Sequence, residues 1–138
     1  MLDLPDVRAA ADCGFTAQAD VILLVTTNEL AALQATRRSL RYLDAGAGDH
    51  AKLRLILNRH TPVTGFKREE VNTALAMQPF AVLSNDYAAI QAALLDGKPV
   101  PPESRFGASL QALCLQLSHK SAPARKNASW LTSLLHRK

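Results

Sequence analysis

The stretch Val21-Ile22-Leu23-Leu24-Val25-Thr26-Thr27 decides the fold, because it is a continuous, largely apolar run rich in β-branched side chains. A run without polar alternation is typical of a strand that is buried on both faces, as in a parallel sheet. Residues 53–58 (LRLILN) and 80–83 (FAVL) predict two further strands. Met1-Leu2-Asp3-Leu4 is a shorter apolar stub, which Pro5 ends, and is another strand candidate.

The segment that follows the first of these runs has helical spacing. Asn28 is expected to cap a helix that begins at Glu29, and Gly46 and Gly48 are expected to end it. The apolar stripe of this helix consists of Leu30, Leu33, Leu40 and Leu43.

Three more helices are predicted, over 67–77, over 87–95 and after Ser104. Asn85 or Asp86 is expected to cap the second of these and Ser104 the third. The stripe of the third consists of Phe106, Leu110, Leu113, Cys114 and Leu117. Strands that alternate with helices through short connections predict an α/β fold with parallel strands and right-handed crossovers.

The composition limits the class of protein. The chain has 138 residues, about one domain or less by length, and 48% of them are hydrophobic while 20% are charged. This composition excludes disordered, collagen-like and disulfide-scaffold proteins. The longest apolar run is too short to span a bilayer, and no signal-peptide pattern is present. Cys13 and Cys114 lack metal or redox spacing and are expected to be reduced in the cytoplasm.

The net charge of +4 is concentrated near the C-terminus. Residues 119–138 hold five basic residues and no acid, whereas residues 1–118 hold 11 basic and 12 acidic residues. We therefore divide the chain into an α/β domain at 1–118, a basic linker at 119–128 and a short amphipathic helix at 129–138. The near-neutral domain argues against DNA as a partner. The helix has an apolar side that predicts either packing on a protein or peripheral contact with a membrane, formed by Trp130, Leu131, Leu134 and Leu135.

No independent catalytic constellation occurs in the sequence. The histidines lack ligand spacing, the serines lack a nucleophile-elbow context, and no GxxxxGK(S/T) phosphate loop is present. What remains is a set of polar residues at the predicted carboxyl ends of strands, where open α/β sheets bind ligands. Asp3 is open to two interpretations, a magnesium ligand or an unliganded strand end. Asn58 is likewise a contact to a base edge or an ordinary turn residue.

Four segments in series carry a resemblance to a known family. They are DLP at 3–5, VILLVTTNELAALQATRRSLRYL at 21–43, LRLILNRH at 53–60 and AVLSNDYAAIQAALLDGKPV at 81–100. Together they resemble the C-terminal half of a MinD/ParA-type deviant P-loop ATPase, and they are most similar to the CpaE/TadZ type of pilus-assembly protein. The resemblance covers about residues 1–118. One departure is Ser84, where such proteins commonly have proline.

The resemblance implies a fold and a set of site residues. The fold would be a partial P-loop NTPase-like three-layer sandwich with a short, mostly parallel sheet that lacks the phosphate-loop half. Asp3 would belong to the magnesium and switch region. Asn58, with Arg59 beside it, would contact adenine, and Asn85 and Asp86 would lie near the base.

The resemblance also bears on cofactors. In such proteins the phosphate loop and its lysine precede the DLP motif, and this sequence begins two residues before that aspartate. We therefore expect no ATP hydrolysis and weak or absent ATP binding by this chain alone, whereas intact relatives would use ATP and magnesium.

In the proteins that the sequence resembles, the phosphate-loop strand lies between the DLP strand and the strand that corresponds to 21–25. Because this sequence lacks the phosphate-loop strand, the resemblance implies a free edge on the strand at 21–25. Because an apolar, unpaired edge invites pairing with another chain, we expect a homodimer or a partner protein that completes the sheet. The expected function is a non-catalytic CpaE/TadZ-like component of Flp or type IV pilus assembly or of polar localisation. It would act in the cytoplasm or peripherally at the inner membrane or cell pole.

Two alternatives remain open at this point. The chain is the C-terminal half of an active MinD/ParA-family ATPase, or it is a ParA-like partitioning module with nonspecific DNA contact. An in-frame phosphate loop upstream of Met1 would favour the first, and a steep salt dependence of DNA binding would favour the second.

Overall fold

The computed structural model describes residues 1–47, 50–61 and 63–120. Its centre is a fully parallel three-stranded sheet in the order β1-β2-β3. The strands are β1 (Ile22–Thr26), β2 (Leu53–His60) and β3 (Ala81–Ser84). Each overlaps a run that the sequence predicts as a strand, so the α/β class and the parallel sheet are confirmed.

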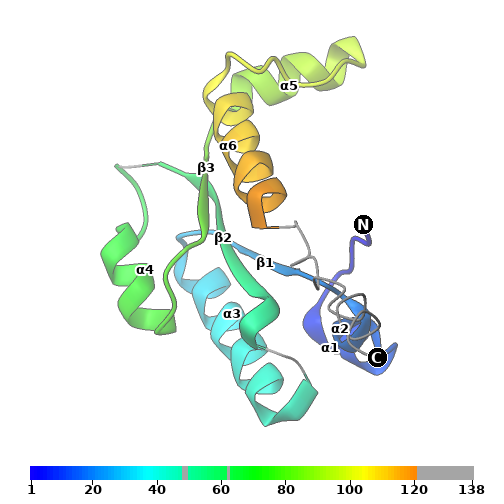
Figure 1. Cartoon of the computed structure of the whole chain (residues 1–138). Helices are drawn as coiled ribbons and strands as arrows, with labels where there is room; N and C mark the ends of the chain where they lie inside the picture. The colour runs from blue at the N-terminus through cyan, green and yellow to red at the C-terminus, as the bar shows by residue number, and fades with distance from the viewer. Residues whose placement is uncertain (48–49, 62, 121–138) are drawn as a thin grey trace, which may run out of the picture.

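Helices cover the two faces of the sheet unequally. They are α1 (Val7–Asp12), α2 (Phe15–Gln18), α3 (Leu30–Tyr42), α4 (Arg68–Leu75), α5 (Tyr87–Asp96) and α6 (Arg105–Lys120). A π-helical turn (Leu43–Ala47) and a 3-10 turn (His50–Lys52) lead from α3 towards β2. Helices α3 and α4 lie on one side of the sheet and α6 on the other, while α5 projects beyond the end of β3 (Figure 1). Among the described helices, none is long and apolar enough to cross a membrane.

The central strand β2 supplies both hydrophobic cores. Leu55 packs with the buried leucines of α3 and with Val71 of α4. Ile56, the next residue, packs on the opposite face with Leu83 of β3 and Leu113 of α6. Successive residues of a strand point to opposite faces, so one apolar run can fill two cores. Full burial of each such side chain contributes about 1.5–3 kcal/mol.

Strand β1 is buried on one face only, which corrects the expectation of burial on both. Ile22 and Leu24 pack against the core below α3. On the other face Val21, Leu23 and Val25 keep 41%, 37% and 56% of their surface exposed. The physical reason is position, because β1 is at the edge of the sheet and the core beneath α6 draws only on β2 and β3.

Residues 1–4 form no strand in the described structure, so the strand prediction for the stub is wrong. Met1 and Leu2 are exposed. The chain instead turns into α1, because the Asp6 carboxylate accepts a hydrogen bond from the Ala9 N–H at 2.8 Å and caps the helix. Helices α1 and α2 were not predicted from the sequence, although an aspartate such as Asp6 is a typical N-cap residue.

Helix α3 differs from the prediction at its first turn. Leu33, Leu40 and Leu43 are buried as expected, but Leu30 is 59% exposed. Thr36 fills the position that faces β1, with its hydroxyl 2.8 Å from the hydroxyl of Thr26. A hydroxyl pair therefore fastens α3 to the carboxyl end of β1.

The start of α6 confirms Ser104 as its cap. The Ser104 hydroxyl accepts a hydrogen bond from the Gly107 N–H at 2.9 Å and donates to the Pro101 carbonyl at 2.7 Å. The turn before the helix thereby lies against Gly107. A Cβ atom at Gly107 would lie 2.1 Å from the Pro101 carbonyl oxygen and 2.9 Å from Cα of Pro102.

This contact predicts that Gly107→Ala destabilises the protein although alanine is the better helix former. Propensity alone would stabilise the helix by about 1 kcal/mol. The clash with backbone atoms should instead cost about 1–3 kcal/mol or more. Urea unfolding measures the difference, and Ala112→Gly at an exposed position of the same helix supplies the size of the propensity effect. A Gly107→Ala protein more stable than the parent would contradict the predicted clash.

Candidate functional site

The carboxyl ends of the three strands meet at one edge of the sheet. Asn28 follows β1 at this edge, and Asn58 and Arg59 are near the carboxyl end of β2. Asn85 and Asp86 follow β3. The Asn85 N–H donates to the His60 carbonyl at 3.0 Å, which holds the ends of β2 and β3 together. The structure thus brings four of the five predicted site residues to one edge, where α/β sheets bind ligands.

Asp3, the fifth predicted site residue, is not part of this group. It is exposed, precedes α1 and belongs to no strand of the described structure. Over residues 1–47, 50–61 and 63–120, no cluster of three or more His, Cys, Asp or Glu side chains is arranged to hold a metal ion. The assignment of Asp3 to magnesium therefore stays a prediction.

The end of β2 is strained at Arg59. This residue has φ of 53°, in the left-handed region, and the pairing of β2 with β3 shifts register between Leu57 and His60. Such a backbone costs a non-glycine residue about 1–3 kcal/mol. The Asn58 side-chain oxygen accepts a hydrogen bond from the Arg59 N–H at 2.9 Å and supports the turn. The bulge leaves the Arg59 side chain exposed beside the half-buried Asn58.

Asp86 serves α6 rather than the helix that follows it. It is the N-cap residue of α5, but its side chain makes no capping bond there. Instead its carboxylate accepts a hydrogen bond from the Arg105 N–H at 3.0 Å, at the first residue of α6. A carboxylate at a helix N-terminus is favoured by the helix dipole. Asp86 thereby links the end of β3 to the helix that covers the sheet.

Asn28, at the same edge of the sheet, has a different role from the helix cap that the sequence predicts. It does not cap α3, whose N-cap is Glu29. Asn28 is only 5% exposed, and its side-chain amide donates to the carbonyls of Thr64 at 2.7 Å and Phe66 at 3.2 Å. Its own carbonyl accepts from the Phe66 N–H at 2.9 Å. Asn28 therefore clamps the loop between β2 and α4 to the end of β1.

The clamp requires Gly65 in the clamped loop. This glycine has φ of 77°, and a Cβ atom there would lie 2.6 Å from the Asn28 carbonyl oxygen and 2.7 Å from its amide nitrogen. Only glycine fits both the backbone conformation and the close approach. The pairing of Asn28 with a Thr-Gly turn gave no sequence signal, because the two segments are far apart in the chain.

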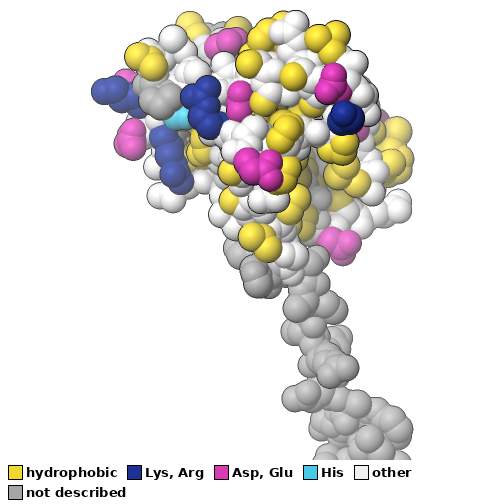
Figure 2. Space-filling view, turned by 90° about the horizontal axis from the view of Figure 1, so that it is seen from above, with side chains coloured by type: hydrophobic (Ala, Val, Ile, Leu, Met, Phe, Trp, Pro, Cys, Tyr) yellow, Lys and Arg dark blue, Asp and Glu magenta, His cyan; other side chains and the backbone are white. Residues whose placement is uncertain are grey.

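The view along the strands from their carboxyl ends shows how side chains are distributed around this edge. Lys and Arg side chains gather on the left of the view, the side on which α4 lies in Figure 1, whereas apolar side chains are frequent on the α5 side (Figure 2). Asp and Glu side chains lie beside these Lys and Arg side chains, so the surface is charged on one flank and largely apolar on the other (Figure 2).

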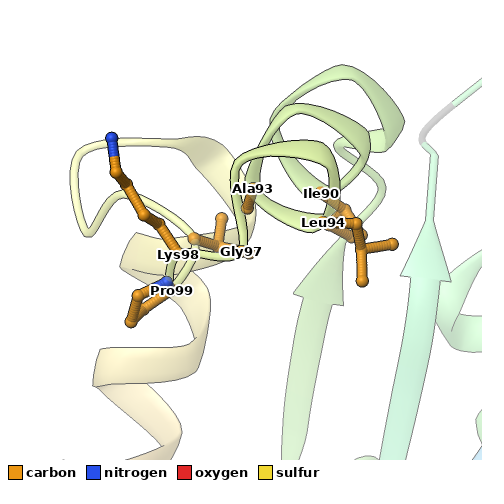
Figure 3. Close-up of a pocket in the computed structure, with 7 residues that line it drawn as sticks. Ile90, Ala93, Leu94, Gly97, Lys98 and Pro99 are labelled. Atoms are coloured by element: carbon orange, nitrogen blue, oxygen red, sulfur yellow. The ribbon is translucent and has the colours of Figure 1, made fainter.

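A shallow hollow of about 310 Å³ lies beside α5 and the turn that follows it. Its lining is almost entirely apolar and consists of Ile90, Ala93, Leu94, Gly97, Lys98, Pro99 and Val100. The amine of Lys98 points away from α5 (Figure 3). The hollow includes none of the predicted site residues, so it is separate from the polar edge.

The clamp predicts that Asn28→Ala lowers stability by about 1–3 kcal/mol, because the side chain makes two part-buried hydrogen bonds, to the carbonyls of Thr64 and Phe66, that alanine cannot replace. Asn28→Asp should cost more, since it aims a carboxylate at those carbonyls. Urea unfolding measures both. Asn58→Ala is the matched control, because its side chain makes one local hydrogen bond, and it should cost less than either. Parent-like stability of Asn28→Ala would contradict the clamp.

Comparison with known proteins identifies the fold. No protein-family model and no curated protein match the sequence. Among solved structures, a ParA family ATPase from Chlorobium tepidum TLS is similar with a TM-score of 0.66 and 22% identity, over 72% of this chain and 42% of that one.

Two MinD structures are similar to the same extent. MinD in the MinC:MinD cell division complex of Aquifex aeolicus gives a TM-score of 0.63 at 15% identity, over 80% of this chain and 47% of its own. The Pyrococcus furiosus cell division ATPase MinD gives 0.62 at 22% identity, over 75% and 44%. This chain spans less than half the length of each of these proteins. It has the α/β fold of part of a ParA/MinD-type ATPase, with a short parallel sheet.

Proposed function

We propose that this chain works by associating with another polypeptide along the free edge of β1, which completes its sheet. The observation that carries the proposal is the position of β1 at the edge of the sheet. Among the described residues, β1 lies at one edge of the sheet and pairs with β2 alone, so the other side of its backbone has no neighbouring strand. An apolar strand with an unpaired edge is a template for another strand.

Two features of the similar structures support this proposal, namely the share of their length that is matched and a protein complex among them. The similar ATPases are more than twice as long as the matched portion, since the matches cover 42–47% of them. One of them was solved as a MinC:MinD complex, so a protein with this fold binds a protein partner.

As the finer assignment, we propose a non-catalytic, CpaE/TadZ-like role in Flp or type IV pilus assembly or in polar localisation. Support comes from two sequence segments, Asn58-Arg59 and the NDY…GKP segment that begins at Asn85. Both lie at the polar edge, one at the end of β2 and the other starting at the end of β3. The protein would act in the cytoplasm, with a peripheral position at the inner membrane or cell pole.

A second candidate, part of an active MinD/ParA-family ATPase, is favoured by one observation. The adenine-side residues of the resemblance, Asn58 and Asn85, are brought to one edge of the sheet, where the Asn85 N–H meets the His60 carbonyl. The sequence has no phosphate-loop motif to anchor the phosphates, which is why we place association first.

Sedimentation velocity over a range of concentrations tests the association. The parent chain is expected to form dimers or larger species, and Val25→Lys is expected to sediment as a monomer, because an edge lysine blocks strand pairing. Val63→Lys is the matched control at a residue that is 91% exposed outside the sheet, and it should associate like the parent. A parent chain that stays monomeric at high micromolar concentration, both alone and after addition of an extract of the cells that produce it, would contradict the proposal.

Calorimetry with Mg-ATP separates the two candidates. The association role predicts weak or undetectable binding by this chain alone and no phosphate release. A low-micromolar dissociation constant that Asn58→Ala weakens would instead favour the ATPase candidate. A DNA-partitioning role, which the near-neutral domain disfavours, would show as DNA binding that falls steeply with salt.

A further inference from the structure

The helix predicted from the sequence at residues 129–138 lies outside the described residues. We propose that this segment docks on its own domain beside α6 and covers the exposed side of β1. The surface concerned, which we call the β1–α6 face, consists of Leu23 and Val25 of β1, Val21 directly before that strand, and Leu110 and Cys114 of α6. The proposal concerns the face of β1 and is independent of what pairs with its edge.

The β1–α6 face is continuous because of the register of the sheet and the orientation of α6. Val25 is paired with Ile56, so the two side chains share a face, and Ile56 is buried beneath α6. On α6, the Ser109 hydroxyl accepts a hydrogen bond from the Ser84 N–H of β3 at 3.2 Å, which turns that side of the helix towards β3. Leu110 and Cys114 lie on the opposite flank at helical spacing, towards β1, and both are exposed.

The dimensions of this face suit one short helix. Packed helices lie about 8–10 Å apart, and strands lie about 4.8 Å apart, so a helix next to α6 would lie over β1. Five residues of β1 extend about 17 Å, and ten helical residues, 129–138, extend about 15 Å. The face is thus as long as the segment proposed to cover it.

The chain beyond α6 is long enough to reach the face. Helix α6 runs antiparallel to β2 and β3 and ends at Lys120 (Figure 1). Residues 121–128 are eight in number, and extended they span about 26–29 Å, well above the roughly 8–10 Å between neighbouring helices. Connections of this length are ordinary between antiparallel helices.

The chemistry of the segment matches the face. Its apolar residues, Trp130, Leu131, Leu134 and Leu135, recur at helical spacing and would lie on one side. Residues 119–138 carry five basic residues and residues 1–118 a slight acidic excess, so the charges of the two parts are opposite in sign. A lipid surface or a second copy of the chain would compete for the same apolar side, and the experiment distinguishes these occupants.

Trp130 is the only tryptophan, so its fluorescence reports on this segment directly. At a concentration where the chain is monomeric, docking predicts a blue-shifted emission that acrylamide quenches weakly. Leu110→Asp should shift the emission to the red and raise quenching. Leu94→Asp, at an exposed leucine of α5 outside the face, should leave both unchanged.

Labelling of Cys114 by a bulky maleimide is a second measurement, and it requires no substitution in α6. The docked segment should protect Cys114, and Leu134→Asp should speed its labelling, while Cys13, exposed elsewhere in the chain, is the internal control. Identical emission in the parent and Leu110→Asp, together with unprotected Cys114, would overturn the proposal. A blue shift that appears only at high concentration would assign the face to a second copy, and one that appears only with anionic vesicles would assign the segment to a membrane; either result would also overturn it.

Discussion

A parallel sheet is stable only when its faces are covered, and this constraint governs the structure of the chain. Strand β2 meets it fully, with Leu55 and Ile56 in two separate cores. Strand β1 meets it on one face alone, where α3 is fastened by the Thr36–Thr26 hydroxyl pair. Over residues 1–47, 50–61 and 63–120, one face and one edge of β1 lack a covering element, and both proposals concern these two surfaces.

The residues at the polar edge of the sheet have structural roles of their own. Asn28 holds the β2–α4 loop, Arg59 is fixed in a left-handed turn, and Asp86 starts α6. Because these side chains have structural partners, their presence at the edge shows a pre-formed surface and not by itself a nucleotide site. The similarity to ParA and MinD structures, all at 22% identity or less, supports the fold of this edge.

The sequence predicted the strands, the class of fold and the Ser104 cap, because periodicity and capping are local properties. It failed where tertiary position decides. Val25 lies in an apolar run, yet it is exposed because β1 is at the edge of the sheet. Leu30 is apolar at the expected helical spacing, yet it is exposed in the first turn of α3. Asn28 follows a strand and precedes a helix, so it resembles a cap, but its partners lie 36 and 38 residues away. Asn58, Arg59, Asn85 and Asp86 were brought together as the strand order requires, whereas Asp3 was not, because Asp6 starts a helix directly after it.

The central claim is that β1 is an association edge, and amide hydrogen exchange along β1 tests it most directly. The account predicts that residues 22–26 exchange faster at low protein concentration than at high concentration, while the amides of β2, which lies between β1 and β3, keep the same protection. Concentration-independent exchange throughout β1 would contradict the claim, because it would mean that no second polypeptide pairs with this edge.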